Sequence, residues 1–120
     1  MKPATAKAKG RETENLAVEY LRSEGVTHAE RRRLNGSFDQ GDVTGWPGVC
    51  VEVKSGAALN PQQWLRELAA EMTNSHSSTG FVMVRPKGVP NPTDWFSLLP
   101  NPVLMQLMRD AGYIATEAAA

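Results

Sequence analysis

Hydrophobic positions along the chain change their spacing several times, and each change marks an expected element. From Gly10 onward apolar residues recur at helical spacing until Gly25, which predicts a helix that ends at this glycine. Residues 26–34 then predict a strand, and residues 42–46 predict a second, shorter strand. The clearest strand is predicted for residues 49–54, where Val occupies alternate positions.

The second half of the chain repeats the succession of helix and strand. Asn60 and Pro61 are typical of the N-cap and first position of a helix, which also has an apolar stripe. That stripe consists of Trp64, Leu65, Leu68, Ala69 and Met72. Residues 80–85 and 95–99 predict strands, and the Asn-Pro pair at the start of residues 101–112 predicts a last helix. The order α-β-β-β-α-β predicts an α/β fold with a mixed β-sheet flanked by helices.

Length and composition limit the classes of protein that remain. The 120 residues are expected to form a single domain, with residues 1–9 as a flexible basic arm and residues 113–120 as a frayed tail. One cysteine and two histidines exclude a disulfide framework and zinc sites built from Cys pairs or His clusters. No apolar run approaches the roughly 20 residues of a membrane span, and no signal peptide is evident, so a cytoplasmic protein is expected.

Positive charge is concentrated near the N-terminus, although 13 basic residues balance 13 acidic ones over the whole chain. Residues 1–33 carry eight Lys or Arg against five Glu, so this part is expected to contact an anionic partner. Lys9 and Arg11 lie at the start of the predicted helix, and Arg31 and Arg33 share one face of the predicted strand. We expect phosphate contacts from these residues; the alternative is a solvated strand edge that discourages aggregation.

Candidate catalytic residues gather on the second and third predicted strands. Glu52 and Lys54 share one face of their strand, opposite the valines, and we expect that face to border a cleft. Antiparallel pairing with the preceding short strand would bring Asp42 beside Glu52. Two close carboxylates repel each other unless a cation neutralises them, and their oxygens suit Mg²⁺ or Mn²⁺. With the Lys54 ammonium nearby, this set suits metal-assisted hydrolysis of a phosphodiester.

These residues together resemble the PD-(D/E)XK nuclease superfamily. The matching pattern comprises Lys9-Gly10, Glu14, Gly41-Asp42 and Glu52-Val53-Lys54. Its upstream part is similar to the opening of the Holliday junction resolvases in that superfamily, and the nearest similarity is to small phage-encoded resolvases. The resemblance spans residues 10–85 and implies a restriction-endonuclease-like core. Residues 86–120 match nothing in the pattern.

The resemblance implies a role for each matching residue. Asp42, Glu52 and the backbone carbonyl of Val53 would bind Mg²⁺, for which Mn²⁺ can substitute. Lys54 would be the catalytic lysine. Glu14, on the first helix, would be the further acid that completes the site.

Several assignments leave an alternative open. Gln62 matches the glutamine that the family often has early in the helix after the lysine, with Gln63 as the alternative. Ser37, in the turn before the first carboxylate, joins the expected DNA-binding residues. Glu12 competes with the acid at position 14 but falls on the solvated side of the helix at 100° per residue. Asp39 competes with the aspartate at position 42 but belongs to the preceding loop.

The expected function is that of a Mg²⁺-dependent endodeoxyribonuclease, specifically a Holliday junction resolvase that cuts four-way DNA junctions as a homodimer. The first alternative is another nuclease of the same superfamily that cuts flaps, single strands or nicked duplex. The second is a non-catalytic DNA-binding module. The third is a structural protein in which the Glu-Val-Lys strand is only a surface pair of opposite charges.

Overall fold

The computed structural model describes residues 5–33, 40–56 and 58–115. Helix α1 spans Ala6–Ser23, and the side chain of Thr5 caps it by accepting the N–H of Ala8. The helix therefore begins four residues before Gly10, so residues 6–9 are helical and the expected flexible arm over residues 1–9 is wrong for this part. The predicted end is confirmed, because Gly25 follows the helix with a φ of 110°.

The strands form two sheets, of which one is the mixed sheet expected from the sequence, whereas the first two strands pair separately. Strands β1 (Glu30–Arg31) and β2 (Val43–Thr44) form an antiparallel pair. Strands β3 (Val49–Ser55), β4 (Thr79–Arg85) and β5 (Phe96–Leu98) form a mixed sheet in the order β3-β4-β5. The predicted order α-β-β-β-α-β is confirmed. In the strand predicted over residues 26–34, the described residues 26–33 contain two in β-structure, because residues 27–28 form a turn.

The central pair of strands is parallel, with Val51 opposite Phe81, Glu52 opposite Val82 and Val53 opposite Met83. A parallel pair needs a crossover connection, and helix α2 (Pro61–Asn74) supplies it between β3 and β4. Its predicted start is confirmed, with Asn60 at the N-cap and Pro61 at the first position. The Asn60 side chain makes no capping hydrogen bond, however, so only its position was predicted correctly.

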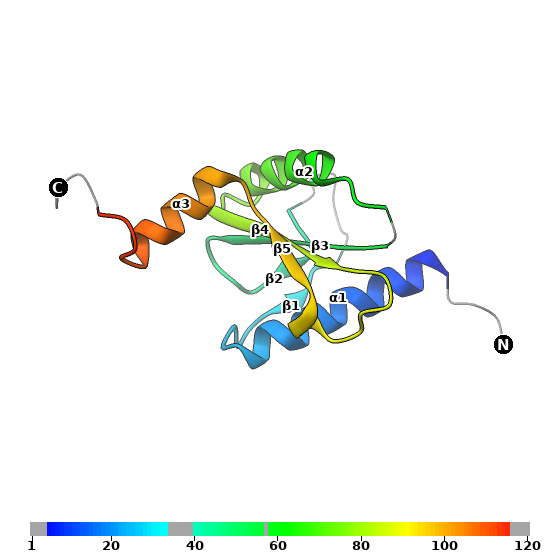
Figure 1. Cartoon of the computed structure of the whole chain (residues 1–120). Coiled ribbons are helices and arrows are strands. Elements are labelled where there is room, and N and C mark those ends of the chain that lie inside the picture. Colours follow the sequence, from blue (N-terminus) through cyan, green and yellow to red (C-terminus); the bar gives the residue numbers. More distant parts are fainter. Residues whose placement is uncertain (1–4, 34–39, 57, 116–120) are drawn as a thin grey trace.

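Two helices cover opposite faces of β3 and β4, giving three layers (Figure 1). On the α1 face the core contains Ala17, Val18, Leu21, Val51, Val53 and Met83. On the α2 face it contains Cys50, Trp64, Leu68, Val82 and Val84. The predicted alternation along β3 is therefore confirmed: Val51 and Val53 face α1, whereas Cys50, Glu52 and Lys54 face the side that α2 covers.

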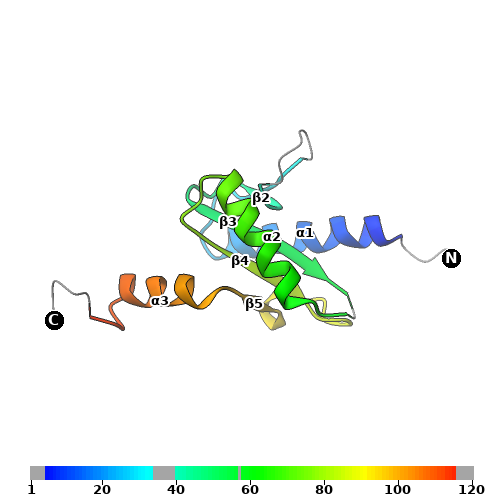
Figure 2. The same cartoon turned by 90° about the horizontal axis from the view of Figure 1, so that it is seen from above.

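The C-terminal part extends away from these layers. A short 3₁₀ turn (Pro92–Asp94) leads into β5, and helix α3 (Asn101–Asp110) follows. The helix projects from the body in both views (Figures 1 and 2), and none of its residues is buried. Among its exposed apolar side chains are Met105, Leu107 and Met108. No helix in the described part of the chain is long and apolar enough to cross a membrane.

Candidate active site

Asp42 is fixed against β3 by both its backbone and its side chain. Its N–H donates to the carbonyl of Val51 at 2.8 Å, and its Oδ2 accepts the N–H of Val53 at 2.7 Å. The preceding Gly41 has a φ of 96°, and a Cβ there would lie 3.0 Å from Cys50 Sγ and 3.1 Å from the Val51 oxygen. Glycine relieves both restrictions, so Gly41 allows Asp42 to approach β3.

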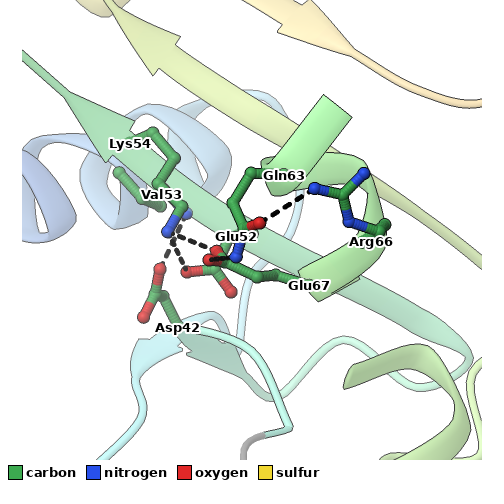
Figure 3. Close-up of polar contacts among 7 residues, drawn as sticks. All are labelled: Asp42, Glu52, Val53, Lys54, Gln63, Arg66 and Glu67. Carbon is green, nitrogen blue, oxygen red and sulfur yellow. Dashed lines mark hydrogen bonds and ion pairs between the residues drawn. The ribbon is translucent and has the colours of Figure 1, made fainter. Parts of the chain in front are cut away.

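This contact replaces the expected ladder between β2 and β3. The strand pair that the sequence predicted is absent from the described sheets, because β2 pairs with β1 and β3 pairs with β4. The Asp42 carboxylate nevertheless lies near Glu52, as expected, because it accepts the hydrogen bond from the Val53 N–H (Figure 3).

Glu52 is a buried acid, with only 5% of its surface exposed. Helix α2 covers it, so the open cleft expected on this face of β3 is closed over Glu52. Burial first, then hydrogen bonds shared with Glu71 and Asp42, then the charges of these two acids, raise the pKa of Glu52 to about 12. A carboxyl group in such surroundings keeps its proton at neutral pH unless a cation takes the place of that proton.

Lys54 lies next to Glu52 and is held by residues of α2 (Figure 3). Its Nζ is 3.9 Å from Glu52 Oε1 and 2.7 Å from Glu67 Oε2. The other oxygen of Glu67 accepts a hydrogen bond from Gln63 Nε2 at 3.1 Å. Gln63 in turn accepts one from Arg66 at 3.0 Å. Helix α2 thus presents a chain of polar contacts that fixes the position of the lysine ammonium.

Electrostatics keep this lysine charged. Burial acts to lower the pKa of Lys54, but the hydrogen bond with Glu67 and the charges of Glu52, Glu67 and Asp42 raise it above its usual value. The hydrogen bond from Lys54, followed by the one from Gln63, lowers the pKa of Glu67. The site therefore carries a stable ammonium beside its buried carboxyl groups.

A basic groove of about 530 Å³ leads to Asp42 between α1 and β1. Its lining comprises Lys7, Gly10, Arg11, Glu14, Arg31, Arg32, Arg33, Gly41 and Asp42. Within it, burial first and then the charge of Asp42 raise the pKa of Glu14, while the charge of Arg31 acts in the opposite direction. Glu14 on α1 and Asp42 on the other wall therefore lie within electrostatic reach of each other.

Three of the expected DNA-binding residues line this basic groove, namely Arg11, Arg31 and Arg33. All three are exposed. Arg32, between the last two, is half-buried and donates to Gln40 Oε1 at 3.4 Å and to the Val43 carbonyl at 3.5 Å. The alternation predicted along this segment is consistent with that difference, since Arg32 turns toward the protein while its neighbours remain available to a ligand.

The remaining sequence candidates lie elsewhere. Lys9 and Glu12 border a different cavity, on the opposite side of α1. The structure therefore brings Glu14, and not Glu12, into the neighbourhood of Asp42. Ser37 and its competitor Asp39 lie outside the described residues.

Helix α2 contributes more to the site than the sequence indicated. Gln62 and Gln63 are both exposed, and Gln63 joins the chain of contacts that ends at Lys54. Glu67 and Glu71 were not predicted at all. Glu71 is only 4% exposed, and it falls three residues after Leu68 in the apolar stripe. An acid inside a buried stripe is a sequence signal that could have identified Glu71 as a site residue.

The donor atoms suit a hard divalent cation, although the described residues contain no group of three or more His, Cys, Asp or Glu side chains arranged to hold a metal ion. Glu52 Oε2 is buried and has no hydrogen-bond partner among the described residues. A carboxylate oxygen of the neighbouring Asp42 would supply a second hard donor to such a cation. These groups fit Mg²⁺ better than a soft metal, because no thiolate or imidazole accompanies them in the described site.

The chain was compared with protein-family models, with curated proteins and with solved structures, and none of the three comparisons found a match.

Proposed function

We propose that this protein is a Mg²⁺-dependent, structure-selective DNA endonuclease with a restriction-endonuclease-like core, and specifically a Holliday junction resolvase. One observation carries the proposal. The carboxyl groups of Asp42 and Glu52 gather beside the ammonium of Lys54, at the end of a groove lined by arginines. A structural role for this set is unfavourable, because buried acids destabilise a fold unless something compensates their charge.

Each group of the site has a part in phosphodiester hydrolysis. Asp42, Glu52 and the carbonyl of Val53 would hold Mg²⁺. When bound, Mg²⁺ supplies positive charge that lowers the pKa of a neighbouring water and stabilises charge on the phosphate. Lys54, held by Glu67, orients the attacking water and stabilises the negative charge that develops on the phosphate oxygens. The 3′-oxygen leaves, and the product carries a 5′-phosphate.

The basic groove supports DNA as the substrate. Arg11, Arg31 and Arg33 present exposed guanidinium groups next to Asp42 and Glu14. Guanidinium groups bind phosphate oxygens in a bidentate manner, and such contacts carry little information about base sequence. Recognition by backbone shape follows, with affinity that falls as the salt concentration rises.

We further propose that the protein acts as a homodimer. Symmetric cuts in two strands of a junction need two sites, and a two-fold pair of identical chains provides them. The apolar side chains exposed on α3, Met105, Leu107 and Met108 among them, support such an association. Sedimentation of the protein with and without junction DNA tests this point, and only monomer under both conditions would contradict it.

The proposed function is tested by incubating the protein with Mg²⁺ and one of three labelled DNA substrates. These are an immobile four-way junction, a matched linear duplex and a flap built from the same arms. The expected result is paired, symmetric nicks in the junction and little cutting of the duplex. Preferential cutting of the flap or duplex would contradict the resolvase assignment and favour another nuclease of the same superfamily. Absence of cutting by a folded protein, with Mg²⁺ and with Mn²⁺, would contradict the proposed activity and favour a non-catalytic DNA-binding module.

A further inference from the structure

A second basic cavity lies on the other side of α1 from the basic groove. It has a volume of about 190 Å³ and is bounded by the segments that leave the carboxyl ends of β3 and β4. The cationic residues of its lining are Lys9, Arg85 and Lys87. In open α/β sheets, the space beyond the carboxyl ends of neighbouring parallel strands is the usual place for a ligand. This position and these charges together point to an anion.

Arg85 is the fixed element of this cavity. Its Nε donates to the Val89 carbonyl at 3.2 Å, and its Nη1 contacts Thr13 Oγ1 at 3.0 Å and Glu12 Oε1 at 3.3 Å. The guanidinium carbon lies 5.8 Å from the centre of the Trp95 ring. A guanidinium held in this way is preorganised, so it loses little conformational freedom when it binds an anion.

The two lysines leave the cavity with an excess of positive charge. Lys9 on α1 and Lys87 after β4 are exposed, and neither forms an ion pair with another described residue. Glu12 is the acid among the lining residues, and it contacts Arg85. Two ammonium groups therefore remain for a ligand that carries negative charge.

We propose that this cavity is a second phosphate site, which binds a backbone phosphate of a DNA strand other than the strand in the basic groove. This inference rests on the proposed nuclease function, because it names a further contact with the same substrate. Helix α1 separates the two sites and has a diameter of about 10–12 Å with its side chains. The major groove of DNA is about 12 Å wide, so phosphates of two strands reach both sides of such a helix. A branched DNA also presents two backbones close together.

The test measures junction binding in EDTA, where no cutting occurs, over a range of salt concentrations. The double variant Lys9→Ala/Lys87→Ala is compared with Arg109→Ala, which removes an exposed cation from α3. Arg85 is left intact because its contacts support the fold. We expect the double variant to bind the junction about tenfold more weakly, with a salt slope smaller by about one. The Arg109→Ala variant should retain the affinity and slope of the wild type.

An unchanged affinity and slope in the double variant, with melting as in the wild type, would overturn the second site. The proposed nuclease function would stand in that case if the wild type still cuts the junction. Titration with inorganic phosphate, followed through the amide NMR shifts of residues 87 and 88, tests the phosphate site independently of the nuclease function. Shifts in the wild type that disappear in the double variant support the phosphate site, even for a protein that cuts no DNA. No shift at any phosphate concentration, together with normal junction binding, overturns it.

Discussion

The two faces of the β3–β4 pair differ in what they bury. Against α1 the sheet buries an apolar set that includes Val51, Val53 and Leu21. Against α2 it buries Cys50 and valines too, but also the acids Glu52 and Glu71, each about 5% exposed or less. The first face gains free energy from apolar burial, whereas the second holds groups whose desolvation is unfavourable.

This difference indicates a division of roles within one small domain. The α1 face provides the stability that the domain needs, because removal of apolar surface from water is the dominant favourable contribution to folding. The α2 face holds carboxyl groups and an ammonium at fixed positions, and their desolvation lowers the stability of the fold. Unfavourable burial of ionisable groups is typical of a functional site. Substitutions on the two faces are therefore expected to have opposite consequences for activity and stability.

The largest expected effect is on activity, from Asp42→Asn. The amide still accepts the N–H of Val53, so the fold is retained, but the negative charge that would hold Mg²⁺ is lost. Cutting of the junction should fall by about a thousandfold while binding of the junction persists. Single-turnover cleavage and a gel-shift assay measure the two properties. Cutting at the wild-type rate would exclude Asp42 as a metal ligand.

The next effect is on stability, from Leu21→Ala on the α1 face. Leu21 is 5% exposed, and its truncation leaves a cavity in the apolar core. The free energy of unfolding should decrease by about 2–5 kcal/mol. The cleavage rate per folded molecule should stay unchanged at a temperature where the variant is folded. Urea unfolding measures the free energy of unfolding. A lower cleavage rate per folded molecule would show that the α1 face also contributes to activity.

A smaller effect on activity is expected from Glu14→Gln, with Glu12→Gln as the matched control on the same helix. Glu14 lies near Asp42, whereas Glu12 pairs with Arg85 on the opposite side of α1. Loss of the charge at Glu14 should slow cutting on the order of tenfold, as for residues that support metal ligands. The Glu12→Gln variant should show no loss. Equal losses in both variants would contradict the assignment of Glu14 to the site.

The smallest effect, taken per pH unit, is a dependence of stability on pH. In the metal-free protein the pKa of Glu52 is raised from 4.5 to about 12, so above pH 4.5 the folded state keeps a proton that the unfolded state releases. This stabilising contribution is complete below pH 4.5 and is lost as pH rises toward 12. The slope is at most on the order of 1 kcal/mol per pH unit.

Urea unfolding between about pH 5 and pH 9 measures this slope. The variant Glu52→Gln, which keeps the shape of a protonated carboxyl group, should flatten it. The exposed Glu19→Gln on α1 serves as the control and should leave the slope unchanged. A slope that persists in Glu52→Gln would assign the uptake of protons to other groups.

Local patterns in the sequence were sufficient for the order of the elements and for the faces of β3 that Glu52 and Lys54 occupy, but not for the bounds of the first helix and the first strand. The valine alternation predicted which face of β3 each residue occupies. These features depend on the backbone period and on conformational restrictions of single residues, which a sequence displays directly.

Features that depend on packing between distant segments were not predictable in this way. No local pattern indicates that β3 pairs in parallel with β4, or that α2 closes over Glu52. The ion pair of Lys54 with Glu67, 13 positions later, follows from that closure. Of the two acids of α2, Glu71 carries a sequence signal, as an acid within an apolar stripe, although the sequence analysis did not single it out.

Cleavage of a four-way junction by the wild type and by Glu52→Gln tests most directly whether the buried acids serve metal-dependent cutting of DNA. Both proteins are assayed in Mg²⁺ and in EDTA, after circular dichroism has shown that both are folded. We expect paired nicks for the wild type in Mg²⁺, none in EDTA, and none for Glu52→Gln under either condition. Equal cutting by the two proteins, or no cutting of any DNA by the folded wild type in Mg²⁺ or Mn²⁺, would contradict this role of the acids.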